Sequence, residues 1–230
     1  MNSTKEINKI KEVYQQRDEC EVIGFQSTLD IIDSFYHERL IFKVFKRYEL
    51  KSLNNKRVID MGCGNGARLR TLMRFGALPE NLYGVDLSSH RVELAQSFSP
   101  NFNIQCGDVS ETEFANNSFD IVMNSTMMSS ICNDELSTKI ANEMCRIVKN
   151  DGVILWYDLR YNNPFNKNVR GYSRVMIKTL FSGYDISFST LTLIPNLTRK
   201  VNLPFFLYQI INLIPFFRTH YLCIIKPAKP

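Results

Sequence analysis

The chain has 230 residues, of which 44% are hydrophobic, and a formal net charge of +5 at pH 7. That length suits one domain with a sizeable core, and the apolar content is that of an ordinary globular protein. No acidic residue follows Asp185, and the positive charges there are few and scattered, which argues against a nucleic-acid-binding protein. This part of the chain is either a lightly charged face or a region attracted to an anionic acceptor or a membrane surface.

The start of the chain and its cysteines predict a cytoplasmic protein. Residues 1–11 are polar and charged, without the apolar region of a secretory signal. The six cysteines show no C-x-x-C spacing, so we expect reduced, mostly buried thiols and no metal site.

Two helices are predicted ahead of the first strand. Apolar residues recur at helical spacing over residues 5–17 and over a longer segment, residues 28–48. Tyr14, Tyr36 and His37 in these helices are either packing and surface residues or side chains that reach over a ligand site.

Residues 57–69, with the sequence RVIDMGCGNGARL, carry the main functional prediction. Val58 and Ile59 form a short apolar run typical of a buried strand, and a helical pattern follows the glycines. Glycines at such a turn let the backbone approach a ligand, because a Cβ would block it. The helix that follows directs free N–H groups and its positive dipole end toward that ligand.

Two classes of cofactor bind at such a turn. With Ala67 in the third position, the glycines also fit the G-x-G-x-x-G/A pattern of NAD and FAD sites. Asp60 favours another cofactor, because a carboxylate there would face a pyrophosphate but can pair with the ammonium group of S-adenosylmethionine (SAM). A tight turn without any ligand is the remaining alternative.

The rest of the chain alternates between strand and helix patterns, which predicts a parallel sheet. We expect strands over residues 82–85, 102–106, 119–123, 153–157, 186–194 and 221–225. We expect helices over residues 89–98, from residue 133 or 134 onward, and from residue 174 to near residue 183, with caps from Ser88, Asn133 or Asp134, and Ser173.

Polar residues follow several of these strands, at the edge where open parallel sheets bind ligands. Asp86 is placed to accept both ribose hydroxyls, and Asp108 to accept the exocyclic amine of adenine, beside the N–H of Val109. Asn124 would line the methionine end. The predicted cofactor-binding residues are Asp60, Gly62, Cys63, Gly64, Gly66, Asp86, Leu87, Asp108, Val109 and Asn124.

Residues 56–157 resemble a class I SAM-dependent methyltransferase in all of its cofactor motifs. The resemblance continues through residues 143–158, although Lys149-Asn150-Asp151-Gly152 stands where relatives often have Lys-Pro-Gly-Gly. Residues 157–164, 168–171 and 218–221 resemble a bacterial subgroup often linked to glycan or secondary-metabolite biosynthesis.

The resemblance implies a single Rossmann-like domain with a mostly parallel seven-stranded sheet, helices on both faces and an antiparallel last strand. SAM would be the methyl donor and S-adenosylhomocysteine the product. Residues 1–50 would form N-terminal helices, residues 51–160 the SAM-binding core, and residues 161–230 an acceptor-side loop, a lid helix and the last strands.

The polar loop over residues 158–171 is the predicted acceptor site. Asp158 is the first candidate for the base that removes a proton from an acceptor hydroxyl, followed by Tyr161 and His37. Alternatively, Asp158 only forms an ion pair with Arg160 or Arg170. Those two arginines, with Asn163, are the predicted substrate-binding residues, since Arg grips phosphate or carboxylate through two donors.

Residues 203–217 form a strongly apolar stretch that is too short to span a membrane. A core or lid helix is the favoured interpretation, and an interfacial helix near a lipid-linked acceptor is the alternative. We therefore expect a cytoplasmic methyltransferase that O-methylates a small polar metabolite or sugar, in glycan or natural-product biosynthesis. The rivals are a methyltransferase for a lipid-like acceptor at the membrane surface and a SAM-binding regulatory protein without turnover.

Overall fold

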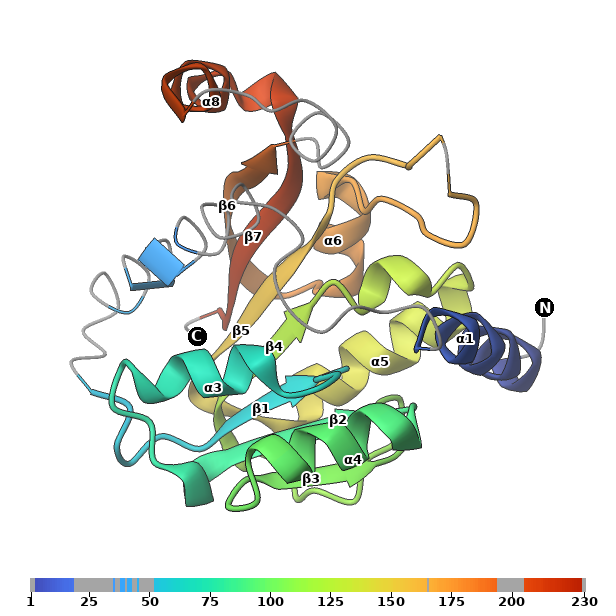
Figure 1. Cartoon of the computed structure of the whole chain (residues 1–230), viewed down its shortest axis with the longest axis vertical. Coiled ribbons are helices and arrows are strands. Elements are labelled where there is room, and N and C mark those ends of the chain that lie inside the picture. The colour runs from blue at the N-terminus through green and yellow to red at the C-terminus, as the bar shows by residue number, and fades with distance from the viewer. Residues whose placement is uncertain are drawn as a thin grey trace.

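A computed structural model describes residues 3–18, 35, 38–39, 41–42, 45, 52–164, 166–193 and 205–228. These residues build one seven-stranded sheet with the order β3-β2-β1-β4-β5-β7-β6 (Figure 1). The strands are β1 Val58–Met61, β2 Leu82–Asp86, β3 Asn103–Cys106, β4 Phe119–Ser125, β5 Val148–Leu159, β6 Tyr184–Leu193 and β7 Arg218–Pro227. Only β7 runs antiparallel to its neighbours β5 and β6, so the predicted fold class is confirmed.

The described helices lie on both faces of this sheet (Figure 1). The α-helices are α1 Ser3–Asp18, α3 Ala67–Met73, α4 Ser89–Phe98, α5 Asp134–Ile147, α6 Arg174–Leu180 and α8 Phe205–Leu213. Short 3-10 turns are η1 Pro79–Asn81, η2 Met128–Ser130 and η3 Pro215–Phe217. Three predicted N-caps are confirmed, since Ser88, Asn133 and Ser173 each accept a hydrogen bond from the backbone N–H three residues on.

Strand alternation divides the core into two layers. Val58 and Ile59 are adjacent and fully buried, yet Val58 packs with α3 and α4 whereas Ile59 packs with α5 and α6. The same alternation is seen at Ile121 and Val122 in β4. Successive side chains of a strand point to opposite faces, so continuous apolar runs predict strands that are covered on both sides.

Two element boundaries differ from the prediction. Strand β5 begins at Val148 instead of Val153, because pairing with β4 exists on both sides of an irregularity between Phe119 and Ile121. Helix α6 ends at Leu180, short of the expected Gly183, where the chain turns with a positive φ of 83°.

Two other expectations, on the second N-terminal helix and on the cysteines, are respectively untested and wrong. Most of the predicted helix over residues 28–48 lies outside the described residues, and so do Tyr36 and His37. The expectation of mostly buried thiols is wrong for the described cysteines. All five are free, but only Cys63 and Cys223 are buried, while Cys106 is exposed.

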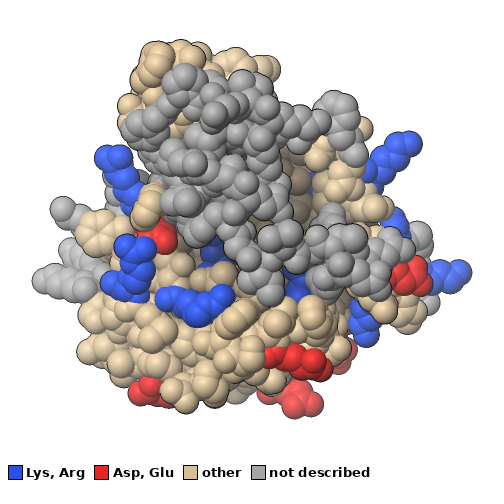
Figure 2. Space-filling view, viewed as in Figure 1, with Lys and Arg blue, Asp and Glu red and all other residues tan. Residues whose placement is uncertain are grey.

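Helix α8 lies outside the two large core clusters. Tyr208 is buried against Leu193, but Phe206 is 60% exposed and Leu213 is 76% exposed. The residues described on α8 are drawn without charge at the top of the molecule in Figure 2, where undescribed residues cover part of the view. Of the predicted core or lid helix, the core alternative is therefore wrong for α8, and the lid role stays a prediction. None of the helices among the described residues is long and apolar enough to cross a membrane.

His220 provides a test of the packing between β5 and β7. Its ring stacks on Tyr157 with centroids 4.8 Å apart, and its Nδ1 lies 2.9 Å from the hydroxyl of Thr219. Burial, together with the nearby charge of Arg68, lowers the pKa of His220 to about 3. The unfolded chain keeps an ordinary histidine pKa of about 6.5, so between these values the unfolded state binds more protons.

This difference lowers the stability of the folded state as the pH falls from about 6.5 toward 4, whereas the burial that raises the pKa of Asp158 to about 6 acts in the opposite direction. We predict that His220→Gln makes the slope of unfolding free energy against pH in this range less positive than in the wild type, as measured by urea denaturation at several pH values. Val175→Gln, at an exposed position on α6, removes no titratable group and is the control, which should leave the slope unchanged. Equal slopes for the wild type and His220→Gln would contradict the assignment.

Candidate active site

The site lies at the point where the order of the strands reverses, because β2 and β3 lie on one side of β1 and β4 lies on the other. Strand β1 is an inner strand of the sheet, paired with β2 on one side and with β4 on the other. From β1 the chain turns into α3, and from β4 it turns into η2. Ligands of open α/β sheets bind at such a switch point, beyond the carboxyl ends of the strands.

The glycine turn after β1 is held against β2. The N–H groups of Gly62 and Cys63 both donate to the carbonyl oxygen of Val85, at 2.8 and 3.1 Å. Gly62 has a φ of 78°, and a Cβ added there would lie 2.4 Å from Cγ of Met127. The turn therefore needs glycine at this position both for the backbone conformation and for the close approach of Met127.

Asp60 lies next to the last residue of β1 and is a buried and incompletely paired carboxylate. Its side chain is 1% exposed, and Oδ1 has no hydrogen-bond partner among the described residues. Burial raises the pKa of Asp60 well above its usual range; the charge of Arg68 partly offsets this effect and that of Asp86 adds to it. Burying a carboxylate without a partner is costly. A ligand ammonium group at this position would supply the missing partner.

Asp86 connects the second strand to the glycine turn. Its Oδ2 accepts a hydrogen bond from the N–H of Gly64 at 2.8 Å, and its Oδ1 accepts one from the N–H of Ser88 at 3.0 Å. A carboxylate offers about four acceptor positions, so capacity remains for the two hydroxyls of a ribose. Asp86 also lines the pocket described next.

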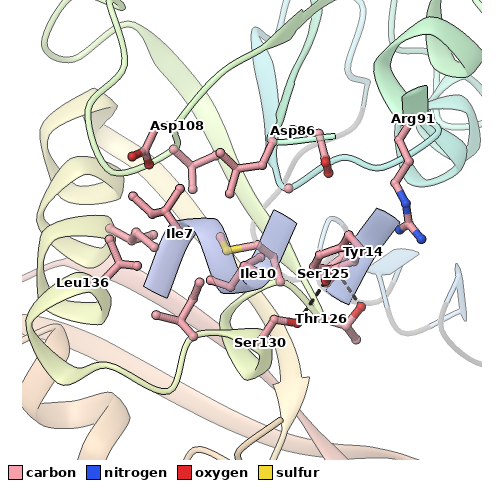
Figure 3. A pocket seen from close by; sticks show the side chains of 16 residues that line it. Ile7, Ile10, Tyr14, Asp86, Arg91, Asp108, Ser125, Thr126, Ser130 and Leu136 are labelled. Atoms are coloured by element: carbon pink, nitrogen blue, oxygen red, sulfur yellow. Dashed lines mark hydrogen bonds between the residues drawn. The ribbon is translucent and has the colours of Figure 1, made fainter. Parts of the chain in front are cut away.

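A pocket that is open to solvent and has an enclosed volume of about 90 Å³ runs along this edge of the sheet (Figure 3). Asp86 and Asp108 lie on its upper side in the figure, and Leu136 of α5 lies at one end. Leu87 and Val109 also line the pocket. Small-molecule sites are mostly apolar with a few polar groups. An adenosine moiety fits this chemistry, with acids for its hydroxyl and amine groups and apolar side chains for its ring.

Helix α1 covers the pocket from the other side. Ile7, Ile10 and Tyr14 contribute to its lining. The hydroxyl of Tyr14 lies 2.9 Å from that of Ser130, and the guanidinium of Arg91 lies 4.8 Å from the centre of the Tyr14 ring. Tyr14 therefore joins α1 to both the α4 and the η2 sides of the site.

The end of β4 contributes different residues from the one predicted. Asn124 is fully buried and directed away from the pocket: its amide donates to Asp158 and its oxygen accepts from the N–H of Met128. The next residues, Ser125 to Met127, line the pocket instead. Thr126 has a φ of 62°, a strained conformation for a β-branched residue.

Asp158 lies behind the site and does not line the pocket. It is fully buried and accepts hydrogen bonds from the N–H groups of Ser129 and Leu159, at 3.0 and 2.8 Å. Burial raises the pKa of Asp158 to about 6, although its hydrogen bonds act in the opposite direction. These contacts hold the η2 turn, so the structure gives Asp158 a positioning role, and the expected ion pair with Arg160 or Arg170 is absent among the described contacts.

The other predicted acceptor residues also lie outside the pocket lining. Arg170 donates to Asp134 at 2.6 Å and to Ser137 at 2.7 Å. Arg160 donates to the carbonyl oxygen of Pro215 and to the hydroxyl of Tyr161. Asn163 and Tyr161 do not line the pocket either. Their roles in substrate binding and catalysis remain predictions.

Sequence reasoning missed the residues that complete the pocket. Ile7, Ile10, Arg91, Met127 and Ser130 all line it. Ile7 and Ile10 were recognised only as apolar positions of a helix, and no sequence signal shows that this helix covers the pocket. The position of Ser130, six residues beyond Asn124, was the one available hint, because loops after strand ends commonly carry functional residues.

Comparison with known proteins agrees with this geometry. Residues 59–156 match the model of a methyltransferase domain. No curated protein matches the chain. Three solved structures share the fold, as follows.

The YcgJ protein of Bacillus subtilis is 20% identical, with a TM-score of 0.58 over 84% of this chain and 100% of its own. A SAM-dependent methyltransferase from Archaeoglobus fulgidus is 16% identical, with a TM-score of 0.59 over 88% and 100%. Phosphoethanolamine N-methyltransferase 1 from Haemonchus contortus, bound to phosphoethanolamine and S-adenosylhomocysteine, is 17% identical, with a TM-score of 0.65 over 99% and 50%.

Residues 59–156 form a methyltransferase domain, so the protein is an enzyme, and its sheet has the class I fold. The unpaired carboxylate of Asp60 fits the ammonium group of SAM, the methyl donor that the sequence predicts. Of the alternatives raised by the glycine turn, neither a dinucleotide nor an empty turn accounts for the unpaired carboxylate of Asp60.

Gly62→Ala tests the close packing at the glycine turn. We predict that it weakens binding of S-adenosylhomocysteine by at least about tenfold, or about 1.4 kcal/mol, in a calorimetric titration. The reason is the clash with Met127, which must move within the pocket lining.

Gly183→Ala is the matched control, because Gly183 has a similar φ of 83° and no atom lies within 4 Å of its added Cβ. This variant should cost about 1–2 kcal/mol of unfolding free energy and leave the affinity unchanged. An equal loss of affinity in both variants would contradict the role given to Met127.

Proposed function

We propose that the protein transfers the methyl group of SAM to a hydroxyl oxygen of a small polar metabolite or sugar. The observation that carries this proposal is the pair of hydroxyls from Tyr14 and Ser130, which lie 2.9 Å apart in the pocket lining. They belong to α1 and η2, on the side of the pocket opposite Asp86 and Asp108 (Figure 3). An acceptor hydroxyl in this region would find a donor and an acceptor of hydrogen bonds.

A small cleft next to the pocket has several polar side chains in its lining. It shares Ile10, Tyr14 and Ser130 with the pocket and adds Glu6, Lys9, Val13 and Asn168. Asn168 belongs to the loop that was predicted to bind the acceptor. We therefore place acceptor recognition between α1 and this loop, with Asn168 as its contact from the loop.

For methyl transfer from SAM, the main task of the protein is to align the two reactants. SAM supplies an activated methyl group, and alignment of two reactants can contribute about 7–11 kcal/mol to lowering a barrier. Removal of the acceptor proton by a positioned base adds about 10²–10⁴-fold. Because Asp158 is fully buried behind η2, we assign the contact with the acceptor hydroxyl to Tyr14 and the positioning of η2 to Asp158.

The biological setting of the acceptor remains a prediction. The link to glycan or natural-product biosynthesis rests on the resemblance of residues 157–164, 168–171 and 218–221. A lipid-like acceptor is the rival, and the exposed apolar face of α8 favours it.

Tyr14→Phe tests the proposed acceptor contact. With a hydroxyl acceptor identified by release of S-adenosylhomocysteine, turnover should fall at least about tenfold, a barrier increase of about 1.4 kcal/mol. Affinity for S-adenosylhomocysteine should stay within about threefold, or about 0.7 kcal/mol, because the ring and its packing are kept.

Tyr83→Phe is the matched control, since Tyr83 lies near the start of β2, at the other end of the strand from Asp86. Its turnover should match that of the wild type. Unchanged turnover in Tyr14→Phe, with a large loss in Tyr161→Phe, would contradict the placement and return the acceptor site to the loop over residues 158–171.

A further inference from the structure

Helix α8 has two apolar faces with different surroundings. One face anchors the helix: Tyr208 is 1% exposed and packs with Leu193, beside partly buried Ile211 and Phe217. The other face consists of exposed side chains. It is formed by Phe206, Leu207, Ile210 and Leu213 of α8 and continues after the helix into Ile214 and into Phe216 of η3, each between 38% and 76% exposed. We call these six residues the α8 patch.

The α8 patch is larger than the scattered apolar residues of an ordinary surface. Phe206, Ile210 and Leu213 follow one another at helical spacing and line the same hollow. A contiguous exposed apolar patch of this kind marks a contact with a protein or a membrane. The described structure gives the patch no covering element, so its partner has to come from outside these residues.

The charges around the α8 patch are positive. Arg39 and Arg218 line the hollow with Phe206 and Leu213, and Arg160 donates to the carbonyl oxygen of Pro215 at 3.2 Å. No acidic residue follows Asp185 in the sequence. Asp185 itself lies near the start of β6, whereas α8 follows the end of that strand.

We propose that the α8 patch docks the enzyme onto a membrane surface that contains anionic lipids. Apolar side chains on one face of a helix, with basic residues around them, are what interfacial helices use. At nine residues α8 is too short to cross a bilayer but long enough to lie along its surface. Arginines at the rim would be attracted by the negative surface potential.

A second copy of the chain is a poorer partner for the same patch. A twofold contact through the α8 patch would bring Arg39, Arg160 and Arg218 of one copy toward the same residues of the other. The elements that form the patch, α8 and η3, contain no acid that could balance these charges. Like charges across an interface are unfavourable, whereas anionic lipids complement them.

The position of α8 connects this surface with the active site. The helix lies between the carboxyl end of β6 and the start of β7. Parallel strands end at a common edge, so α8 belongs to the same edge as the carboxyl ends of β1 and β4. Docking through α8 would bring this edge, and with it the active site, close to the bilayer surface.

Vesicle flotation of the full chain tests the proposal independently of the proposed function. The protein should bind vesicles of phosphatidylcholine with phosphatidylglycerol, bind pure phosphatidylcholine more weakly, and lose the difference at high salt. Phe206→Ser with Phe216→Ser should lower the partition coefficient at least about tenfold. Both side chains are exposed, at 60% and 71%, so the variant should fold and keep its affinity for S-adenosylhomocysteine.

The matched control is Leu78→Ser with Val175→Ser, two exposed apolar residues outside the α8 patch, and it should float like the wild type. Absence of vesicle binding by the wild type would overturn the proposal, as would equal loss in both double variants. A dimer in solution that only the α8 variant dissociates, without vesicle binding, would show that a second copy is the partner. Vesicle binding without any methyl transfer would refute the proposed function and leave this inference standing.

Discussion

The buried carboxylate of Asp60 is the constraint on which the site depends. It lies in the inner strand β1, next to its last residue, and its Oδ1 has no partner among the described residues. Such a group is normally paired or absent from a protein interior, because its desolvation is costly. A bound ammonium group would remove this cost, and we infer that the ammonium group of the proposed donor SAM does so. The unpaired carboxylate therefore lowers the stability of the ligand-free protein and raises its affinity for the methyl donor.

The wall of the pocket is stabilised from behind. Asp158 of β5 and Asn124 of β4 hold the N–H groups of Ser129 and Met128, so the η2 turn is fixed by buried hydrogen bonds. This arrangement directs Met127 and Ser130 into the pocket. Asp158, whose side chain was the first candidate for proton transfer, therefore supports the wall of the pocket. The side chains on the proposed acceptor side carry hydroxyl groups.

The fold and the cofactor motifs were predictable because their signals are local. Apolar runs, glycines and caps act within a few residues, and Asp60, Asp86 and Asp108 follow strands whose ends meet at one edge in any parallel sheet. The direction of a side chain at a strand end is set by distant partners. Asn124 turns inward because Asp158, 34 residues away, accepts its amide, and no local pattern shows this.

The positions of helices α1 and α8 relative to the core were the hardest to predict, because they also depend on partners that are distant in the sequence. The apolar spacing of α1 and that of α8 both fit burial, yet α1 covers the pocket while α8 exposes most of its apolar face. Whether the apolar face of such a helix is buried depends on which apolar side chains of the sheet lie beside it. The pocket edge contributes Leu87 and Met127 beside α1, whereas among the described residues the end of β6 contributes Leu193 to the packing of α8.

The most direct test of the account is a calorimetric titration of S-adenosylhomocysteine into the wild type and Asp60→Asn, combined with thermal unfolding of both free proteins. We predict binding at micromolar affinity or tighter for the wild type and at least about tenfold weaker for Asp60→Asn, because a charge-assisted hydrogen bond contributes about 1.5–3 kcal/mol. The free variant should melt at the same or a higher temperature, since an unpaired buried charge has been removed. Equal affinity in the two proteins, or tight binding of NAD with none of S-adenosylhomocysteine, would contradict the account.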